Sequence, residues 1–168
     1  MLPGDYLALK MTGEIVTTDT GLSEGIFWDF KENGIANDLL TNFEINSNLL
    51  PTVVPVFSVQ GKLSENAARQ LGLNTGIVIS YRAGDQPNNA FSLNVLNPGE
   101  TAATAGTSGV IYSVTDKNAF DIHSRVNTFI HVNNDVRAKR NGVLLCVNGT
   151  GILNSWLRRS MSGAKSCR

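Results

Sequence analysis

The sequence is poor in cysteine and has no long hydrophobic run. Its two cysteines, Cys146 and Cys167, are far apart and form no Cys-x-x-Cys motif. Two distant thiols argue against a disulfide framework and favour a reducing compartment, the cytoplasm. The longest apolar runs, such as residues 143–147, are far too short to cross a bilayer. Residues 1–5 lack the basic flank and apolar segment of a secretory signal. We therefore expect a cytoplasmic protein with no membrane partner.

The formal net charge is zero, and histidine is rare. Fourteen basic residues balance fourteen acidic ones, so no excess of charge points to a nucleic-acid partner. His123 and His131 have no cysteine or histidine at ligand spacing, so no metal site made of protein ligands is expected. The Gly-x-x-x-x-Gly-Lys-Ser/Thr loop and the Gly-x-Ser-x-Gly elbow are both missing. These two absences exclude a P-loop enzyme and a hydrolase of the nucleophile-elbow kind.

The apolar residues that are present, 42% of the chain, suffice for a core. Their spacing predicts helices over residues 3–12, about 35–44, 64–71 and about 152–160, and strands over 27–30, 57–63, 77–81, 128–132 and 143–147. The 77–81 run is almost continuously apolar, which is typical of a central strand covered on both faces. Residues 22–26 are too few to classify, and residues 49–56, with two prolines, are expected to form a connector. The alternation favours an α/β class with a mixed sheet.

The chain is organised around residues 83–109. A helix from Asp85 to Val95 would carry the chain about 16 Å outward at ~1.5 Å per residue. After an Asn-Pro-Gly turn, a strand over residues 101–105 would return about 16 Å at ~3.3 Å per residue. This strand and residues 110–114 are predicted to be the arms of a hairpin with the 106–109 turn at its tip. Because the two legs match, we expect Asp85 and the 106–109 turn to face one cleft.

This arrangement suggests phosphoryl transfer. The dipole of the helix favours the ionised form of Asp85, which could then act as a base toward a hydroxyl; an ordinary helix cap is the simpler alternative. The glycine-rich 106–109 turn could cradle an anion with its backbone N–H groups, although many glycine turns only reverse the chain. A carboxylate base opposite a phosphate cradle is what phosphoryl transfer to a hydroxyl needs. The 148–151 glycine turn gives a weaker signal of the same kind.

Four motifs, taken in order, resemble successive landmarks of the FGGY carbohydrate kinases, and among these the xylulokinases most. They are PGDYLALKMTGE at residues 3–14, AGDQ at 83–86, AGTSG at 105–109 and the 151–158 segment. The resemblance covers essentially the whole chain apart from 163–168. It implies an incomplete actin-like ATPase (ribonuclease H-like) fold with ATP and a sugar bound between two domains. Residues 1–76 would end the N-terminal domain, and residues 77–168 would begin the C-terminal domain.

The resemblance also implies a role for each site residue. Asp85 would take the proton from the sugar hydroxyl that attacks the γ-phosphate of ATP, and Gln86 would hydrogen-bond the sugar. Mg²⁺ would neutralise charge on the phosphates. ATP would be bound by the two glycine turns and the helix after them: Gly106, Thr107, Ser108 and Gly109 at the phosphates, and Gly151 and Ser155 near the adenosine.

The sequence departs from the family pattern at both ends. The N-terminal Asp-x-Gly-Thr phosphate loop, the early sugar-contacting segments and the late C-terminal helices are missing, and residues 164–168 do not follow the pattern. Met1 matches an internal family position. We therefore expect a truncated chain that is inactive alone and belongs to a longer kinase, for which a homodimer stays open. The alternatives are a kinase for ribulose, rhamnulose, gluconate or glycerol, and a non-catalytic actin-like module that binds nucleotide.

Overall fold

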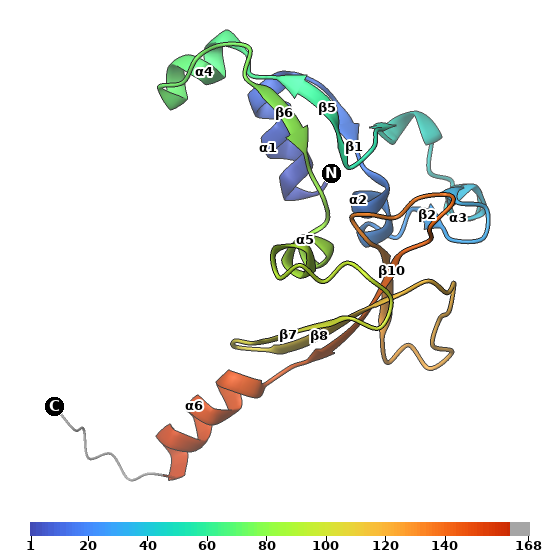
Figure 1. The fold of residues 1–168 in the computed structure, drawn as a ribbon, viewed down its shortest axis with the longest axis vertical. Helices are drawn as coiled ribbons and strands as arrows, with labels where there is room; N and C mark the ends of the chain where they lie inside the picture. Colours follow the sequence, from blue (N-terminus) through green and yellow to red (C-terminus); the bar gives the residue numbers. More distant parts are fainter. Residues whose placement is uncertain (162–168) are drawn as a thin grey trace, which may run out of the picture.

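The computed structural model describes residues 1–161; the departure predicted at residues 164–168 lies outside this range. The chain is extended, with helix α4 and helix α6 at opposite ends of the long axis (Figure 1). Short helices and two-stranded pairings make up the first half, and a four-stranded sheet makes up most of the second. The predicted α/β class is therefore confirmed. Within residues 1–161, no helix is both long and apolar enough to cross a membrane.

The first half begins with the predicted helix, α1 (Pro3–Thr12), which ends at Gly13 in the left-handed conformation (φ 83°). Helix α2 (Asp19–Glu24) follows, and Thr18 caps it by accepting the N–H of Gly21 at 3.2 Å. Residues 22–26, which the sequence left unclassified, thus mostly belong to a helix. The other elements here are β1 (Val16–Thr17), β2 (Trp28–Asp29), β3 (Gly34–Ile35), α3 (Asn37–Asn42), the 3-10 helix η1 (Ser47–Leu49) and β4 (Thr52–Val53).

Strands β5 (Phe57–Lys62) and β6 (Val78–Tyr81) form an antiparallel pair connected through helix α4 (Glu65–Leu71). As predicted, Ser64 caps this helix, accepting the N–H of Ala67 at 3.3 Å. The prediction of a central strand at 77–81 is wrong for this part of the chain. Strand β6 pairs with β5 alone among the described residues, and Val78 is 45% exposed. An apolar run indicates a surface that can be buried, but it does not supply the neighbour that covers it.

The four-stranded sheet is antiparallel, in the order β7-β8-β10-β9. The predicted mixed sheet is therefore wrong for the described residues, where the one parallel pairing, β1 with β4, is a separate two-stranded sheet. Its strands are β7 (Thr101–Ala105), β8 (Gly109–Thr115), β10 (Asn141–Val147) and β9 (Asn127–Ile130). Ala105 pairs with Gly109, which confirms the predicted hairpin and its tip. Helix α5 (Asp85–Ser92) contributes Ala90 to a core that also contains Tyr112 and Leu144 from the sheet. The sheet therefore supports the helix that begins at Asp85.

Helix α5 is shorter than predicted. It ends at Ser92, with Leu93 as its C-cap, and Asn94 follows in the left-handed conformation (φ 57°). Val95 still packs in the core, but on a turn rather than on the helix. The prediction that the outward helix and the returning strand have equal lengths is therefore wrong. The apolar spacing that suggested a longer helix came from a residue that the turn, not the helix, brings to the core.

Candidate active site

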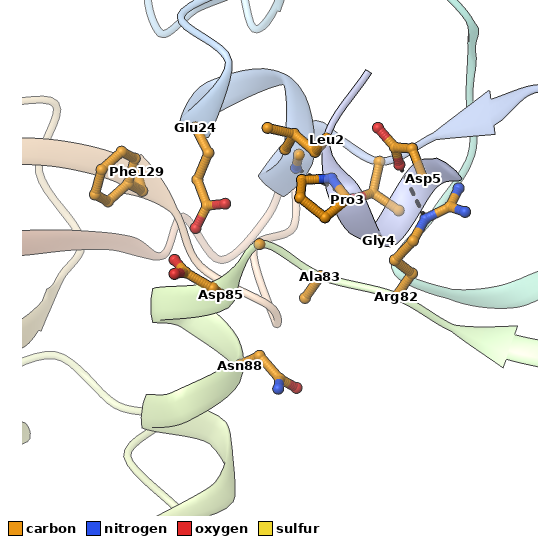
Figure 2. Close-up of a pocket in the computed structure, with 13 residues that line it drawn as sticks. Leu2, Pro3, Gly4, Asp5, Glu24, Arg82, Ala83, Asp85, Asn88 and Phe129 are labelled. Carbon is orange, nitrogen blue, oxygen red and sulfur yellow. Dashed lines mark hydrogen bonds and ion pairs between the residues drawn. The ribbon is translucent and has the colours of Figure 1, made fainter. Parts of the chain in front are cut away.

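A cavity of about 580 Å³ opens beside the first turn of α5 (Figure 2). The start of α1, the end of α2 and the segment between β6 and α5 surround it, and β9 contributes one aromatic ring. Its lining residues are Leu2, Pro3, Gly4, Asp5, Thr18, Gly21, Glu24, Arg82, Ala83, Gly84, Asp85, Asn88 and Phe129. Asp85, the predicted base, thus lies at the wall of a hollow, as a catalytic carboxylate must.

A second carboxyl group, that of Glu24, faces Asp85 in this cavity (Figure 2). Glu24 is the last residue of α2, and its Oε1 accepts the N–H of Gln86 at 3.3 Å. A Cβ on Gly84 would lie 2.3 Å from Cδ of Glu24, so the carboxyl group occupies the space that the missing side chain leaves. Burial, and then the negative charge of Asp85, raise the pKa of Glu24 to about 7. The sequence analysis missed Glu24 because no motif surrounds it.

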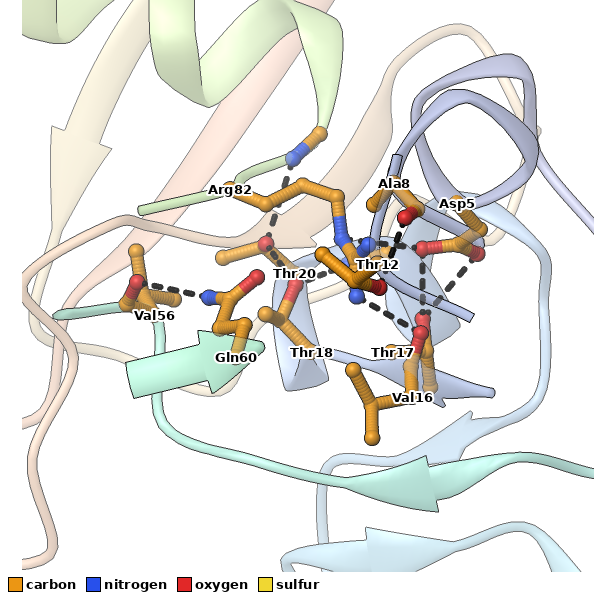
Figure 3. Close-up of polar contacts among 12 residues, drawn as sticks. Asp5, Ala8, Thr12, Val16, Thr17, Thr18, Thr20, Val56, Gln60 and Arg82 are labelled. Carbon is orange, nitrogen blue, oxygen red and sulfur yellow. Dashed lines mark hydrogen bonds and ion pairs between the residues drawn. The ribbon is translucent and has the colours of Figure 1, made fainter. Parts of the chain in front are cut away.

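Buried threonines fix the start of α5 to α2. The N–H of Gly84 donates to Oγ1 of Thr20 at 3.1 Å, and Thr20 in turn shares a 2.8 Å hydrogen bond with Thr18 (Figure 3). Both hydroxyl groups are buried. Since Gly84 immediately precedes Asp85, these bonds and the Glu24–Gln86 bond hold both sides of the candidate base. Asp85 therefore sits on a well-anchored helix start.

An ion pair between Asp5 and Arg82 forms the far wall of the cavity. Nε of Arg82 lies 3.1 Å from Oδ1 of Asp5, and the two side chains are only 8–9% exposed. Nη2 of Arg82 donates to the carbonyl oxygen of Val16 at 2.6 Å, and the hydroxyl of Thr17 donates to Oδ2 of Asp5 at 3.2 Å (Figure 3). Burial lowers the pKa of Arg82, and Asp5 opposes that shift. The pair joins α1 to the end of β6.

The two predicted ATP-binding turns touch one another. Gly151, at the start of α6 (Thr150–Met161), donates its N–H to the carbonyl oxygen of Gly106 at 3.0 Å, and Ile152 donates to that of Thr107 at 3.2 Å. A Cβ on Gly151 would lie 2.3 Å from the oxygen of Gly106, so only glycine permits this approach. The second glycine turn, the weaker of the two signals in the sequence, thus supports the first.

The hairpin tip has backbone N–H groups that lack an acceptor among the described residues. Gly106 donates its N–H to the carbonyl of Ser108 at 3.1 Å, so that group is engaged within the turn. The N–H groups of Thr107 and Ser108 have no acceptor among residues 1–161. Ser155, the other predicted nucleotide contact, is exposed on α6, and its carbonyl accepts from Nε of Arg159 at 3.3 Å.

The lining residues of the cavity give no direct support to the prediction that Asp85 and the hairpin tip face one cleft. None of the residues 106–109 is among its lining residues in the described part of the chain, and neither is Gln86. Gln86 instead contributes its backbone N–H to Glu24. A cleft shared by Asp85 and the 106–109 turn therefore stays a prediction, as do the individual roles of these residues.

A model of the N-terminal domain of the FGGY family of carbohydrate kinases matches residues 1–92, more than half of the chain. The chain belongs to the FGGY family of carbohydrate kinases. The predicted family is thus confirmed. That match runs past the predicted boundary at residues 76 and 77, which stays a prediction.

Sequence relatives of this FGGY chain include xylulose kinases. That of Streptomyces rubiginosus is 30% identical over 135 residues, and that of Staphylococcus xylosus is 24% identical over 131 residues. These matches cover 80% and 78% of this chain but only 27% of each relative. The chain therefore spans about a quarter of the length of the curated relatives it matches.

Solved structures of FGGY kinases share the fold. The xylulose kinase from Rhodospirillum rubrum superposes with a TM-score of 0.82 at 25% identity, over 96% of this chain and 32% of that one. A gluconate kinase from Lactobacillus acidophilus gives a TM-score of 0.87 at 21% identity, over 96% and 32% of the two chains. A Plasmodium falciparum glycerol kinase with ADP gives a TM-score of 0.82 at 20% identity, over 94% of this chain and 31% of that one. The predicted actin-like fold is thus confirmed, and this chain forms a part of it.

Proposed function

We propose that the intact protein transfers a phosphoryl group from ATP to a sugar hydroxyl, converting D-xylulose to D-xylulose 5-phosphate in the cytoplasm. The observation that carries this proposal is the position of Asp85 in an FGGY chain, at the anchored first turn of α5 and at the wall of a cavity. The xylulose kinases among the sequence relatives support the choice of sugar.

Asp85 acts as the general base in this proposal. Its carboxylate accepts the proton of the attacking hydroxyl, and the dipole of α5 stabilises the charge that it carries beforehand. Gln86 follows it and hydrogen-bonds another hydroxyl of the sugar. Because Gly84 is tied to Thr20, the backbone that carries this carboxylate is already fixed when the substrate arrives.

The hairpin tip is suited to phosphates. The N–H groups of Thr107 and Ser108, which have no acceptor among residues 1–161, are the donors that an anion-binding turn offers, and the neighbouring Gly106 is exposed. Gly151 lets α6 approach this turn, and Ser155 lies one turn further along that helix, toward the adenosine in this proposal. Bound ATP supplies the phosphoryl group, and Mg²⁺ neutralises its charge.

Magnesium would be held mainly by the phosphates. Residues 1–161 contain no cluster of three or more side chains able to ligate a metal. Mg²⁺ commonly keeps several waters and binds through substrate phosphates with one or two carboxylates. We further propose that residues 1–76 end one domain, that residues 77–168 begin the next, and that these 168 residues alone are inactive.

The test compares the intact protein with its Asp85→Asn variant, following ADP release with D-xylulose. Loss of the base should lower turnover by about 10²–10⁴-fold. Asp38→Asn is the matched control, because Asp38 is also an exposed aspartate in the first turn of a helix but does not line this cavity. Unchanged turnover in Asp85→Asn would refute the role of Asp85 as the base, and no turnover in the intact wild type would favour the alternative of a non-catalytic module that binds nucleotide.

The competing substrates are tested in the same assay. Structural neighbours include a gluconate kinase and a glycerol kinase, so gluconate, glycerol, ribulose and rhamnulose are assayed beside D-xylulose. The proposal expects the highest kcat/KM for D-xylulose. A higher value for another substrate would replace xylulose while leaving the proposed role of Asp85 intact.

A further inference from the structure

We propose that Glu24 is a positioning residue for Asp85 and a charge-selecting residue of the cavity, which admits a neutral sugar or polyol and disfavours a sugar acid. This inference rests on the proposed function, because it assumes that the cavity beside Asp85 receives the sugar.

The positioning role follows from the way Glu24 holds the start of α5. Its Oε1 accepts the N–H of Gln86 at 3.3 Å, and its carboxyl group lies against the Cα of Gly84. The two residues in contact with it are therefore the immediate neighbours of Asp85. A side chain that fixes both neighbours also fixes the direction in which Asp85 projects.

Glu24 itself is held by a rigid helix. Most of α2 is buried, and Thr18 caps its first turn. Ser23, beside Glu24, is buried and accepts the N–H of Ile130 from strand β9 at 3.0 Å. The carboxyl group of Glu24 thus comes from an element fastened to the sheet, so it faces Asp85 in a defined position (Figure 2).

The charge-selecting role follows from the ions that line the cavity. Two carboxyl groups, Glu24 and Asp85, face each other there, and Arg82 is the one cation among the described lining residues. The charge of Arg82 is already paired with Asp5, and its Nη2 donates to a backbone carbonyl; its Nε and Nη1 are buried and have no hydrogen-bond partner among residues 1–161. A sugar acid would bring a further negative charge with no free cation to receive it, whereas a neutral polyol offers hydroxyl donors to both carboxyl groups.

The surroundings of Glu24 explain why it can carry a proton near neutral pH. Burial and the charge of Asp85 raise its pKa to about 7. The other ionisable groups near it are the paired Asp5 and Arg82 and the buried Tyr112, whose pKa is raised by burial and also by Glu24. Tyr112 hydrogen-bonds the neutral ring of His131 at 3.0 Å. None of these supplies a free positive charge to Glu24, which is consistent with a cavity suited to neutral ligands.

The test of selection uses Glu24→Gln in the intact protein, with D-xylulose and D-gluconate as probes. Glutamine keeps an oxygen for the N–H of Gln86 but removes the charge, so the ratio of kcat/KM for gluconate to that for xylulose should rise about tenfold or more at pH 8. Glu14→Gln is the control, since Glu14 is exposed and outside the cavity. An unchanged ratio in Glu24→Gln would overturn the selecting role.

The test of positioning needs no turnover. Carboxyl-carbon NMR should find the Glu24 titration near pH 7, and Asp85→Asn should move it to lower pH. A Glu24 carboxyl group that did not face Asp85 would titrate independently of it, so an unmoved midpoint would overturn the inference. Failure of the wild type to phosphorylate or bind any sugar would refute the proposed function and the selecting role together, and the NMR result would still decide the positioning of Asp85.

Discussion

The carbonyl oxygen of Gly106 lies where a side chain on Gly151 would begin: a Cβ built on Gly151 would be 2.3 Å from that oxygen. The same two residues share a 3.0 Å backbone hydrogen bond. Two turns that are 45 positions apart in the sequence are thus one structural unit, and the start of α6 cannot change without moving the hairpin tip.

We predict that Gly151→Ala destabilises the protein and weakens its affinity for ATP. In a free helix this change would stabilise by up to about 1 kcal/mol, but overpacking against Gly106 should cost about 1–3 kcal/mol. Thermal unfolding and titration with a fluorescent ATP analogue measure the two effects. Asn154→Ala, at an exposed position of the same helix, should be neutral or slightly stabilising. A stabilised Gly151→Ala variant would contradict the contact.

A second prediction concerns the buried pair of Asp5 and Arg82. Asp5→Ala leaves the Arg82 charge without its partner, which should cost about 3–5 kcal/mol of stability. The double variant Asp5→Leu/Arg82→Met should recover much of this loss, because no unpaired charge remains. Urea unfolding of the single and double variants gives the coupling.

The Asp121–Arg125 pair is the control for that experiment. Its ions lie 2.9 Å apart, but Arg125 is 72% exposed. Removing it by Asp121→Ala should therefore cost much less stability than Asp5→Ala, because solvent screens the pair. Equal losses for Asp5→Ala and Asp121→Ala would show that burial of the first pair has no energetic weight.

A third prediction follows from His131, which is fully buried between Tyr112 and the carbonyl of Val95. Burial, and to a lesser degree the charge of Arg140, lower its pKa from 6.5 to about 4. Between these pH values His131 binds a proton in the unfolded chain but not in the folded protein, so its contribution to stability falls by about 2–3 kcal/mol as the pH decreases from about 6.5 to 4.

Histidine variants test the origin of that pH dependence. The difference in stability between the wild type and His131→Gln, measured between pH 4 and 7, should shrink as the pH decreases, because only the wild type loses the His131 contribution; the variant is also less stable at pH 7 because its hydrogen bonds are lost. His123→Gln should leave the slope unchanged, since His123 is exposed. A difference between the wild type and His131→Gln that stays constant with pH would assign the effect to other groups.

Local features were predictable from the sequence, and tertiary ones were not. Ser64 and Gly13 act through neighbours in the chain, so the helices they delimit were predicted correctly. Glu24 gains its role only because folding brings it against Gly84, and no local pattern records that contact. The exposure of Val78 depends in the same way on which strands lie beside it. The motif around Asp85 was recognisable, but the groups that support it came from elsewhere in the fold.

The last prediction concerns stability and Glu24. The folded protein raises its pKa from 4.5 to about 7, so between these values the folded state binds a proton that the unfolded state has released. The contribution of Glu24 to stability should therefore fall as the pH rises from about 4.5 to 7, opposite in sign to the contribution of His131 where the two ranges overlap. Glu24→Gln cannot ionise, so it should be more stable than the wild type at pH 8, with the advantage shrinking toward pH 4.5. Thermal unfolding at both pH values measures the difference.

Asp85→Asn should reduce the same pH dependence, because it removes one of the charges that oppose ionisation of Glu24. If the difference in stability between the wild type and Glu24→Gln is the same at both pH values, then Glu24 ionises as freely in the fold as in water.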